Sequence, residues 1–205
     1  MTMRPDEALA QIRQIRGQLA RQEVYRGMRA ASVAGTALVA QVAALTQPLL
    51  VPLPEQTPSA WVLLWVCAAL AAAALLLGQL AWSSARASSQ ERAATGAALA
   101  AFLPPIAVGA LVTAPLVAHG DFDLLPGLWA IFAGLALFAT RSMLPKASGA
   151  VASAYVLGGA ATLLFLRGAA ALSPWVMGTL FGAGQLAASV VLYWNLERVA
   201  RDGEE

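Results

Sequence analysis

Long runs of apolar side chains, separated by short polar segments, are the main pattern of this sequence. Six such runs cover residues 30–53, 61–82, 97–118, 124–140, 150–166 and 175–195. Their lengths are close to the roughly 20 residues that a helix needs to cross the hydrocarbon core of a bilayer. The short connections favour antiparallel packing of neighbouring helices. The pattern predicts an all-α membrane bundle of six transmembrane helices arranged as three hairpins.

The third run is the least regular, because Pro104 and Pro105 lie near its start and Pro115 lies near its end. Proline has no backbone N–H and clashes with the preceding helical turn, so it kinks or ends a helix. We therefore expect this helix to be kinked or to begin late.

The composition supports a location in the lipid bilayer. Hydrophobic residues make up 59% of the 205-residue chain and charged residues only 12%, whereas about a quarter of the residues in soluble domains are charged. So few ionic side chains cannot cover the surface of a soluble globule. The single cysteine, Cys67, excludes an internal disulfide and a metal site built from cysteines.

The basic residues are divided unevenly between the two sides of the predicted bundle. With six spans, all but Arg167 of the 13 Lys and Arg residues fall on one side. Positively charged connections are retained on the cytoplasmic side. We therefore expect a multi-pass membrane protein with both termini in the cytoplasm. Trp61, Trp129 and Trp175 open the even-numbered spans, and we expect them at the outer headgroup interface.

The segment before the first span has the pattern of an amphipathic helix. At 100° per residue, Ile12, Ile15 and Leu19 fall on one narrow face. Arginines such as Arg13 and Arg16 flank this face, where their stems can reach lipid phosphates. We expect a cytoplasmic helix on the membrane surface. It serves either as a topology anchor or as a docking site for a partner protein.

The predicted domain organisation follows from these patterns. It comprises a cytoplasmic amphipathic helix (1–29), a transmembrane domain (30–196) and a cytoplasmic tail (197–205). The partners expected are the lipid bilayer and a membrane or cytoplasmic protein. Nucleic acid is not expected, because the chain has neither a basic domain nor an aromatic platform.

One connection carries side chains of the metal-binding type. The stretch "HGDFD" places His119, Asp121 and Asp123 between the third and fourth spans. Imidazole and carboxylate groups bind divalent metals, but a structural site normally has four ligands. The alternative is a solvated turn in which Asp123 caps the next helix. We favour the turn and expect neither a metal nor a cofactor.

The spans lack the residues that most membrane chemistry uses. No Asp, Glu, Lys, Arg or His lies near the middle of a predicted span, although ion-coupled transporters and proton relays usually carry such residues. A membrane hydrolase would need a nucleophile with a base or a metal, so an enzyme is not expected. Gln41, Gln79 and Gln185 could line a polar cavity, but hydrogen bonding between helices is the commoner use of such residues.

Small residues recur at every fourth position in the later spans, a spacing that lets helix backbones approach closely in lipid. We expect these stripes to pack helices within one chain, and a homodimer is the alternative. They comprise Ala150, Ala154 and Gly158 in the fifth span, Gly178 and Gly182 in the sixth, and Ala130 and Gly134 in the fourth.

Two stretches resemble a group of uncharacterised bacterial six-span membrane proteins of similar length. They are "DEAL" through "IRQIR" (residues 6–16) and "DLLPGLW" (residues 123–129). The resemblance implies a six-span bacterial membrane protein and no known activity. Together, the observations predict a non-enzymatic membrane subunit that acts as a scaffold, accessory or regulatory protein. The alternative is a permease for a neutral or lipid-like small molecule.

Overall fold

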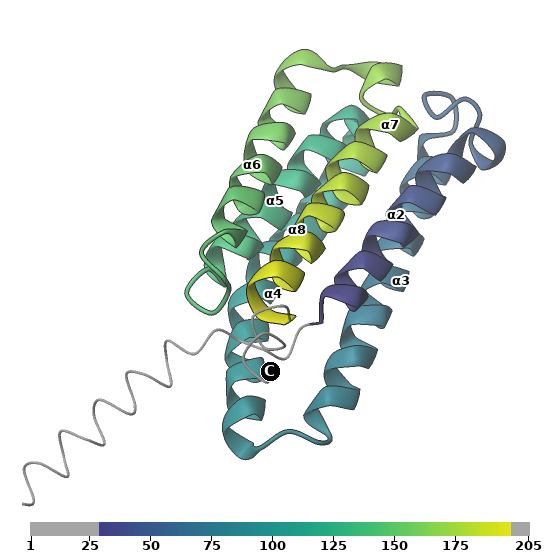
Figure 1. The fold of residues 1–205 in the computed structure, drawn as a ribbon. Helices are drawn as coiled ribbons and strands as arrows, with labels where there is room; N and C mark the ends of the chain where they lie inside the picture. The colour runs from purple at the N-terminus through teal and green to yellow at the C-terminus, as the bar shows by residue number, and fades with distance from the viewer. Residues whose placement is uncertain (1–28, 198–205) are drawn as a thin grey trace, which may run out of the picture.

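The computed structural model describes residues 29–197, and the regular secondary structure in this part of the chain is entirely helical. Six helical segments in it are long and apolar enough to cross a membrane. The chain is therefore a multi-pass membrane protein, and the predicted all-α bundle of six spans is confirmed (Figure 1). The predicted amphipathic helix, with Ile12, Arg13, Ile15, Arg16 and Leu19, lies outside the described residues, as does the tail from residue 198.

The first five spans are each built on a single α-helix, and the sixth is composite. The first five are α2 (Ala30–Leu50), α3 (Pro58–Ser84), α4 (Ser89–His119), α5 (Leu125–Ala139), which follows the short helix η1 (Phe122–Leu124), and α6 (Ser148–Phe165). The sixth contains η2 (Gly168–Ala170), α7 (Pro174–Met177), the π-helical segment η3 (Gly178–Ala183), α8 (Gly184–Leu192) and a second π-helical segment, η4 (Tyr193–Glu197).

Helix α4 begins at Ser89 rather than near residue 97, so the expected late start was wrong. A capping box explains the early start: the Ser88 side chain accepts a hydrogen bond from the Glu91 N–H, and the Glu91 carboxylate accepts one from the Ser88 N–H. These bonds satisfy backbone donors that the first turn would otherwise leave unpaired. The helix continues through its three prolines and ends before Gly120, whose φ of 84° is left-handed. Glycine adopts this conformation without steric cost.

The spans form a curved layer whose two edges are α3 and α4. Along the layer, α3 packs on α2, α2 on the sixth span, α8 on α6, α6 on α5, and α5 on α4. The two edge helices follow each other in the chain but contact each other little. Both extend beyond the other helices at the end where α2 begins (Figure 1).

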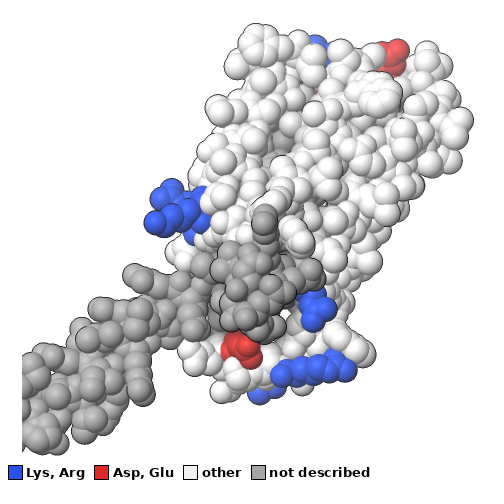
Figure 2. Space-filling view, viewed as in Figure 1, with Lys and Arg blue, Asp and Glu red and all other residues white. Residues whose placement is uncertain are grey.

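Charged side chains lie near the ends of the described helices, and most of the flank visible in Figure 2 carries no charged side chain. The connection between α5 and α6, the turn between α3 and α4, and the start of α2 are at the same end of the up-and-down topology. That end, called the inner end after the predicted orientation, carries Arg29, Arg86, Arg92, Arg141 and Lys146, and the opposite end, called the outer end, carries Arg167.

Helices α5 and α6 make the most extensive contact in the bundle. A Cβ atom built on Gly127 would lie 2.7 Å from the carbonyl oxygen of Gly159, and one on Gly134 would lie 2.8 Å from that of Ala152. Ala130, between the two glycines on α5, is 0% exposed. The backbones therefore approach more closely than any larger side chain would allow, which maximises dispersion contacts in lipid.

The contact between α5 and α6 predicts opposite effects for two glycine substitutions. Gly159→Ala is expected to lower the free energy of unfolding by about 1–3 kcal/mol, the usual cost of overpacking a filled contact. Gly96→Ala on α4 is the matched control, since nothing lies within 4 Å of its built Cβ. Alanine there should stabilise the helix by up to about 1 kcal/mol. Denaturant unfolding in detergent, followed by circular dichroism, measures both, and equal stabilities would contradict the close contact.

Candidate functional site

The three candidate metal ligands of the outer connection do not form a metal site. His119 Nδ1 lies 2.7 Å from the carbonyl oxygen of Pro115 on its own helix. Asp123 Oδ2 accepts a hydrogen bond of 3.2 Å from the Gly168 N–H and lies 3.7 Å from the Arg167 guanidinium. Asp121 precedes η1 and forms no side-chain cap there. Within residues 29–197, no group of three or more His, Cys, Asp or Glu side chains is placed to hold a metal ion.

Asp123 instead connects two outer loops. Its contacts with Arg167 and Gly168 join the connection between α4 and α5 to the connection between α6 and the sixth span. The expected helix cap is not formed, because the residue before α5 is Leu124, which has no capping side chain. The Arg167 side chain is 65% exposed, and an exposed ion pair of this kind contributes at most about 1 kcal/mol.

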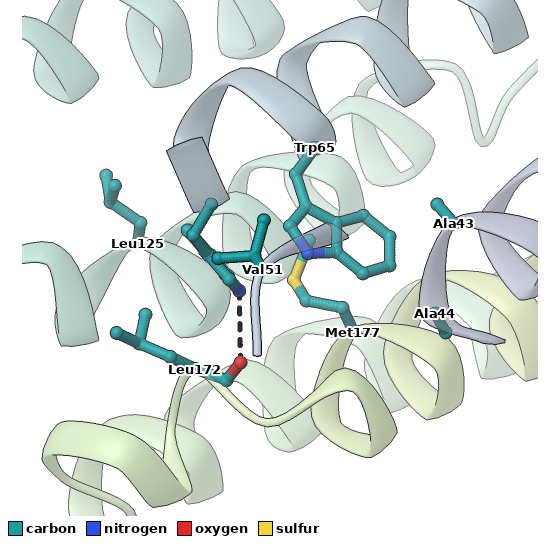
Figure 3. Close-up of a cluster of buried hydrophobic side chains, with 8 residues drawn as sticks. Ala43, Ala44, Val51, Trp65, Leu125, Leu172 and Met177 are labelled. Carbon is teal, nitrogen blue, oxygen red and sulfur yellow. Dashed lines mark hydrogen bonds between the residues drawn. The ribbon is translucent and has the colours of Figure 1, made fainter. Parts of the chain in front are cut away.

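A buried hydrogen-bonded cluster joins α2, α3 and the segment before α7 at the outer end of the bundle. Gln47 is 1% exposed. Its Nε2 donates to the carbonyl oxygen of Leu172 (2.8 Å), and its Oε1 accepts from Trp65 Nε1 (2.9 Å). The same Leu172 oxygen accepts from Trp61 Nε1 at 3.0 Å. Apolar side chains, including Met177, surround this cluster (Figure 3).

Trp61 extends the cluster to the other side of the bundle. Its ring stacks on Trp129 of α5 with a centroid distance of 5.8 Å and an interplanar angle of 11°. Trp129 Nε1 in turn donates to Thr113 Oγ1 of α4 at 2.9 Å. Trp61 lies near the start of α3, but its ring is 0% exposed and its N–H has a buried acceptor, so the ring packs inside the bundle, which the sequence did not predict. Trp175, in contrast, is 73% exposed.

Two of the three candidate cavity glutamines form side-chain hydrogen bonds, one between two spans and one within a single helix. Gln41 Nε2 donates to the carbonyl oxygen of Gly178 at 3.1 Å, so it bridges α2 and the sixth span. Gln79 Nε2 donates to the Ser83 hydroxyl on its own helix at 2.8 Å. The partly buried Gln185 lies on α8. The bond of Gln41 supports the packing interpretation for that residue, whereas the bond of Gln79 stays within α3.

Only some residues of the predicted small-residue stripes pack against a neighbouring helix. Gly178 and Gly182 are buried, and Cβ atoms built on them would meet Gln41 of α2. In α6, however, Ala150 and Ala154 are exposed. Only Gly158 of the predicted stripe approaches a neighbouring helix, because its built Cβ would meet Leu180 of the sixth span.

The face of α6 that contacts α5 is displaced from the predicted stripe. It consists of Ala152, Tyr155 and Gly159, all of which are buried. The spacing of these residues is also helical, so the sequence contains a signal for them. The same helix carries several such spacings, and the sequence does not select between them.

The largest surface that the bundle leaves uncovered lies on α3 and α4. Although these are the two longest helices, only Trp61, Trp65 and Leu80 are buried on α3, and only Gly109 is buried on α4. The exposed positions of α3 include a continuous line of small residues at helical spacing: Cys67, Ala71, Ala74, Gly78, Ala81 and Ala85. At 100° per residue, this line lies on the side of α3 away from the residues that pack on α2.

Comparison with known proteins found no matching family model, no matching curated protein and no matching solved structure. The resemblance to bacterial six-span membrane proteins therefore stays a prediction.

The hydrogen bond between Gln47 and Trp65 predicts energetic coupling of these two residues. Gln47→Leu leaves the Trp65 N–H unpaired in an apolar surrounding, and we expect it to lower the free energy of unfolding by about 1–3 kcal/mol. Combined with Trp65→Phe, the loss should fall short of the sum of the single losses by about 0.5–2 kcal/mol. The control cycle pairs Gln47→Leu with Trp175→Phe at an exposed ring and should be additive. Additivity in both cycles would show that the hydrogen bond contributes nothing.

Proposed function

We propose that the protein is a non-enzymatic integral membrane subunit that binds a partner protein laterally through the free face of α3. The small-residue line from Cys67 to Ala85 carries this proposal. Lipid chains cover apolar helices of any shape, so exposure alone does not indicate a partner. Small residues, in contrast, are enriched where transmembrane helices pack closely on each other.

The contrast with α6 strengthens the proposal. The exposed surface of α6 carries the large side chains Leu157, Leu164 and Phe165, which are 68%, 75% and 79% exposed. Such side chains form a rough surface that suits fluid acyl chains. The exposed surface of α3 also carries large side chains, among them Leu70 and Leu77. The line from Cys67 to Ala85 beside them contains only small residues, so a second helix can pack on it at short range.

The hydrogen bonding of the spans supports a binding role rather than catalysis or transport. The side chains of Gln41, Gln47 and Ser189 are engaged across helices: Gln41 with Gly178, Gln47 with Leu172 and Trp65, and Ser189 with the carbonyl oxygen of Ala30 at 2.8 Å. Groups committed to packing are not free to bind a passing solute. A permease for a neutral or lipid-like molecule remains the alternative.

Site-specific photo-crosslinking tests the lateral interface. A photoreactive residue in place of Ala74, on the free face of α3, is expected to give a discrete crosslinked protein product in intact cells. The matched control is the same residue at Leu157 of α6, which is equally accessible to lipid and should give no discrete product. Mass spectrometry of the product identifies the partner. The proposal fails if Ala74 and Leu157 give the same pattern, and a product formed by two copies of the chain would indicate a homodimer instead.

We further propose that the protein lies in the bacterial cytoplasmic membrane with the α3–α4 turn and both termini in the cytoplasm. The uneven distribution of Lys and Arg between the two ends of the bundle supports this orientation.

Cysteine labelling tests the orientation. With Cys67→Ala as background, Ser59→Cys at the start of α3 should react with a membrane-impermeant thiol reagent in intact cells. Ser88→Cys at the α3–α4 turn should react only after the membrane is opened. Both serines are exposed in the structure, so burial does not protect either one. Labelling of Ser88→Cys but not of Ser59→Cys in intact cells would reverse the orientation.

A further inference from the structure

We propose that the turn between α3 and α4 binds an anionic phospholipid. Its phosphate contacts Arg86 and Arg92, and its acyl chains fill the space between the inner halves of the two helices. The proposal goes beyond the proposed function, because it concerns a ligand that the chain binds without a protein partner.

The first observation is the separation of α3 and α4. The two helices are joined by only four residues, 85–88, and helices joined by so short a connection normally pack along their length. Here they contact each other little. In a bilayer, the space that diverging apolar helices leave open is occupied by acyl chains, because no water is available at that depth.

The second observation is the arrangement of charge at the turn. The guanidinium carbon of Arg86 lies 4.0 Å from the centroid of the Trp82 ring, and that ring is 68% exposed. Tryptophan prefers the headgroup interface, so the ring holds the guanidinium at the depth of lipid phosphates. A cation held over an aromatic face keeps its in-plane N–H donors free for a phosphate oxygen.

The neighbouring charges leave the two arginines available. The Glu91 carboxylate accepts the Ser88 N–H at 2.7 Å in the capping box, which fixes it on the first turn of α4. Neither Arg86 nor Arg92 forms an ion pair within the described part of the chain. Two guanidinium groups beside one engaged carboxylate attract a headgroup of net negative charge more strongly than a zwitterionic one.

The bundle contains a matched control for this site. The connection between α5 and α6 lies at the same end and also carries two basic residues, Arg141 and Lys146. Near that connection, the helices that it joins are in close contact, because a Cβ built on Gly134 would lie 2.8 Å from the carbonyl oxygen of Ala152, so they leave no space for acyl chains. Unspecific attraction between basic loops and an anionic membrane would make the two connections contribute equally to lipid binding. The proposed site depends on the α3–α4 turn and not on the α5–α6 connection.

Native mass spectrometry of the purified chain, titrated with equal amounts of phosphatidylglycerol and phosphatidylcholine in detergent, tests the proposal. We expect the parent chain to retain phosphatidylglycerol preferentially. The variant Arg86→Ala/Arg92→Ala should weaken this binding about thirtyfold, from the loss of two charges near the phosphate. The variant Arg141→Ala/Lys146→Ala should bind as the parent does. Equal losses in both double variants, or no loss in either, would overturn the proposal.

A second variant tests the acyl-chain part of the site. Gly96→Leu keeps both arginines and adds a side chain where the structure has open space, so folding should survive and unfolding measurements can check this. We expect it to release phosphatidylglycerol, and unchanged retention would contradict the acyl-chain position.

If Arg86→Ala/Arg92→Ala does not fold, Arg92→Gln takes its place, because that change leaves the pair of Arg86 and Trp82 intact. Parent-like lipid binding by Arg92→Gln would count against the phosphate contact.

Discussion

The close backbone contact between α5 and α6 is the interaction on which the packing of this bundle depends. In a bilayer, no hydrophobic force drives helices together, so association relies on dispersion contacts and hydrogen bonds. Gly127 and Gly159 supply part of this contact, α4 packs on the pair through α5, and the sixth span packs on it through α6. Gly109 of α4 receives Phe132 of α5, and Gly158 of α6 receives Leu180 of the sixth span. In each case, a glycine on one helix makes room for a large side chain on the next.

The outer end of the bundle is held by a second kind of interaction. A polar group without a partner in hydrocarbon costs several kcal/mol, so the amide of Gln47 and the indole of Trp65 can be buried only together. Their bond, and the two bonds to the Leu172 carbonyl, set the relative positions of α2, α3 and the start of the sixth span. The stack of Trp61 on Trp129 then joins α3 to α5 at the outer end of the bundle. No comparable contact joins α3 and α4 at the inner end of the described bundle.

The sequence predicts the number of spans because hydrocarbon thickness imposes their length. It does not predict which face of a helix packs, as α6 shows. This helix has small residues at 150, 152, 154, 158 and 159, so more than one stripe satisfies the same spacing rule. The choice of Ala152 and Gly159 over Ala150 and Ala154 is made by the shape of α5. The burial of the Trp61 ring was not predicted for a similar reason, since the acceptor of its N–H is the carbonyl of Leu172, 111 residues away. Periodicity contains no information about a partner so distant in the chain.

Close packing distinguishes the helix faces that stabilise the fold from the faces that are exposed on the surface of the bundle. Where glycine meets large side chains, as between α5 and α6, the helix surfaces are complementary and are buried against each other. Helix α3 uses one face against α2, and its opposite face has a line of small residues that are exposed in the described bundle. At the end of that face, Trp82 and Arg86 form a pair suited to the headgroup region rather than to another helix. A helix with a smooth apolar face and an aromatic–cationic end is complementary to a neighbour within the bilayer and to a phosphate at its edge. Within residues 29–197, the hairpin of α3 and α4 is therefore the part for which we propose binding partners outside the chain.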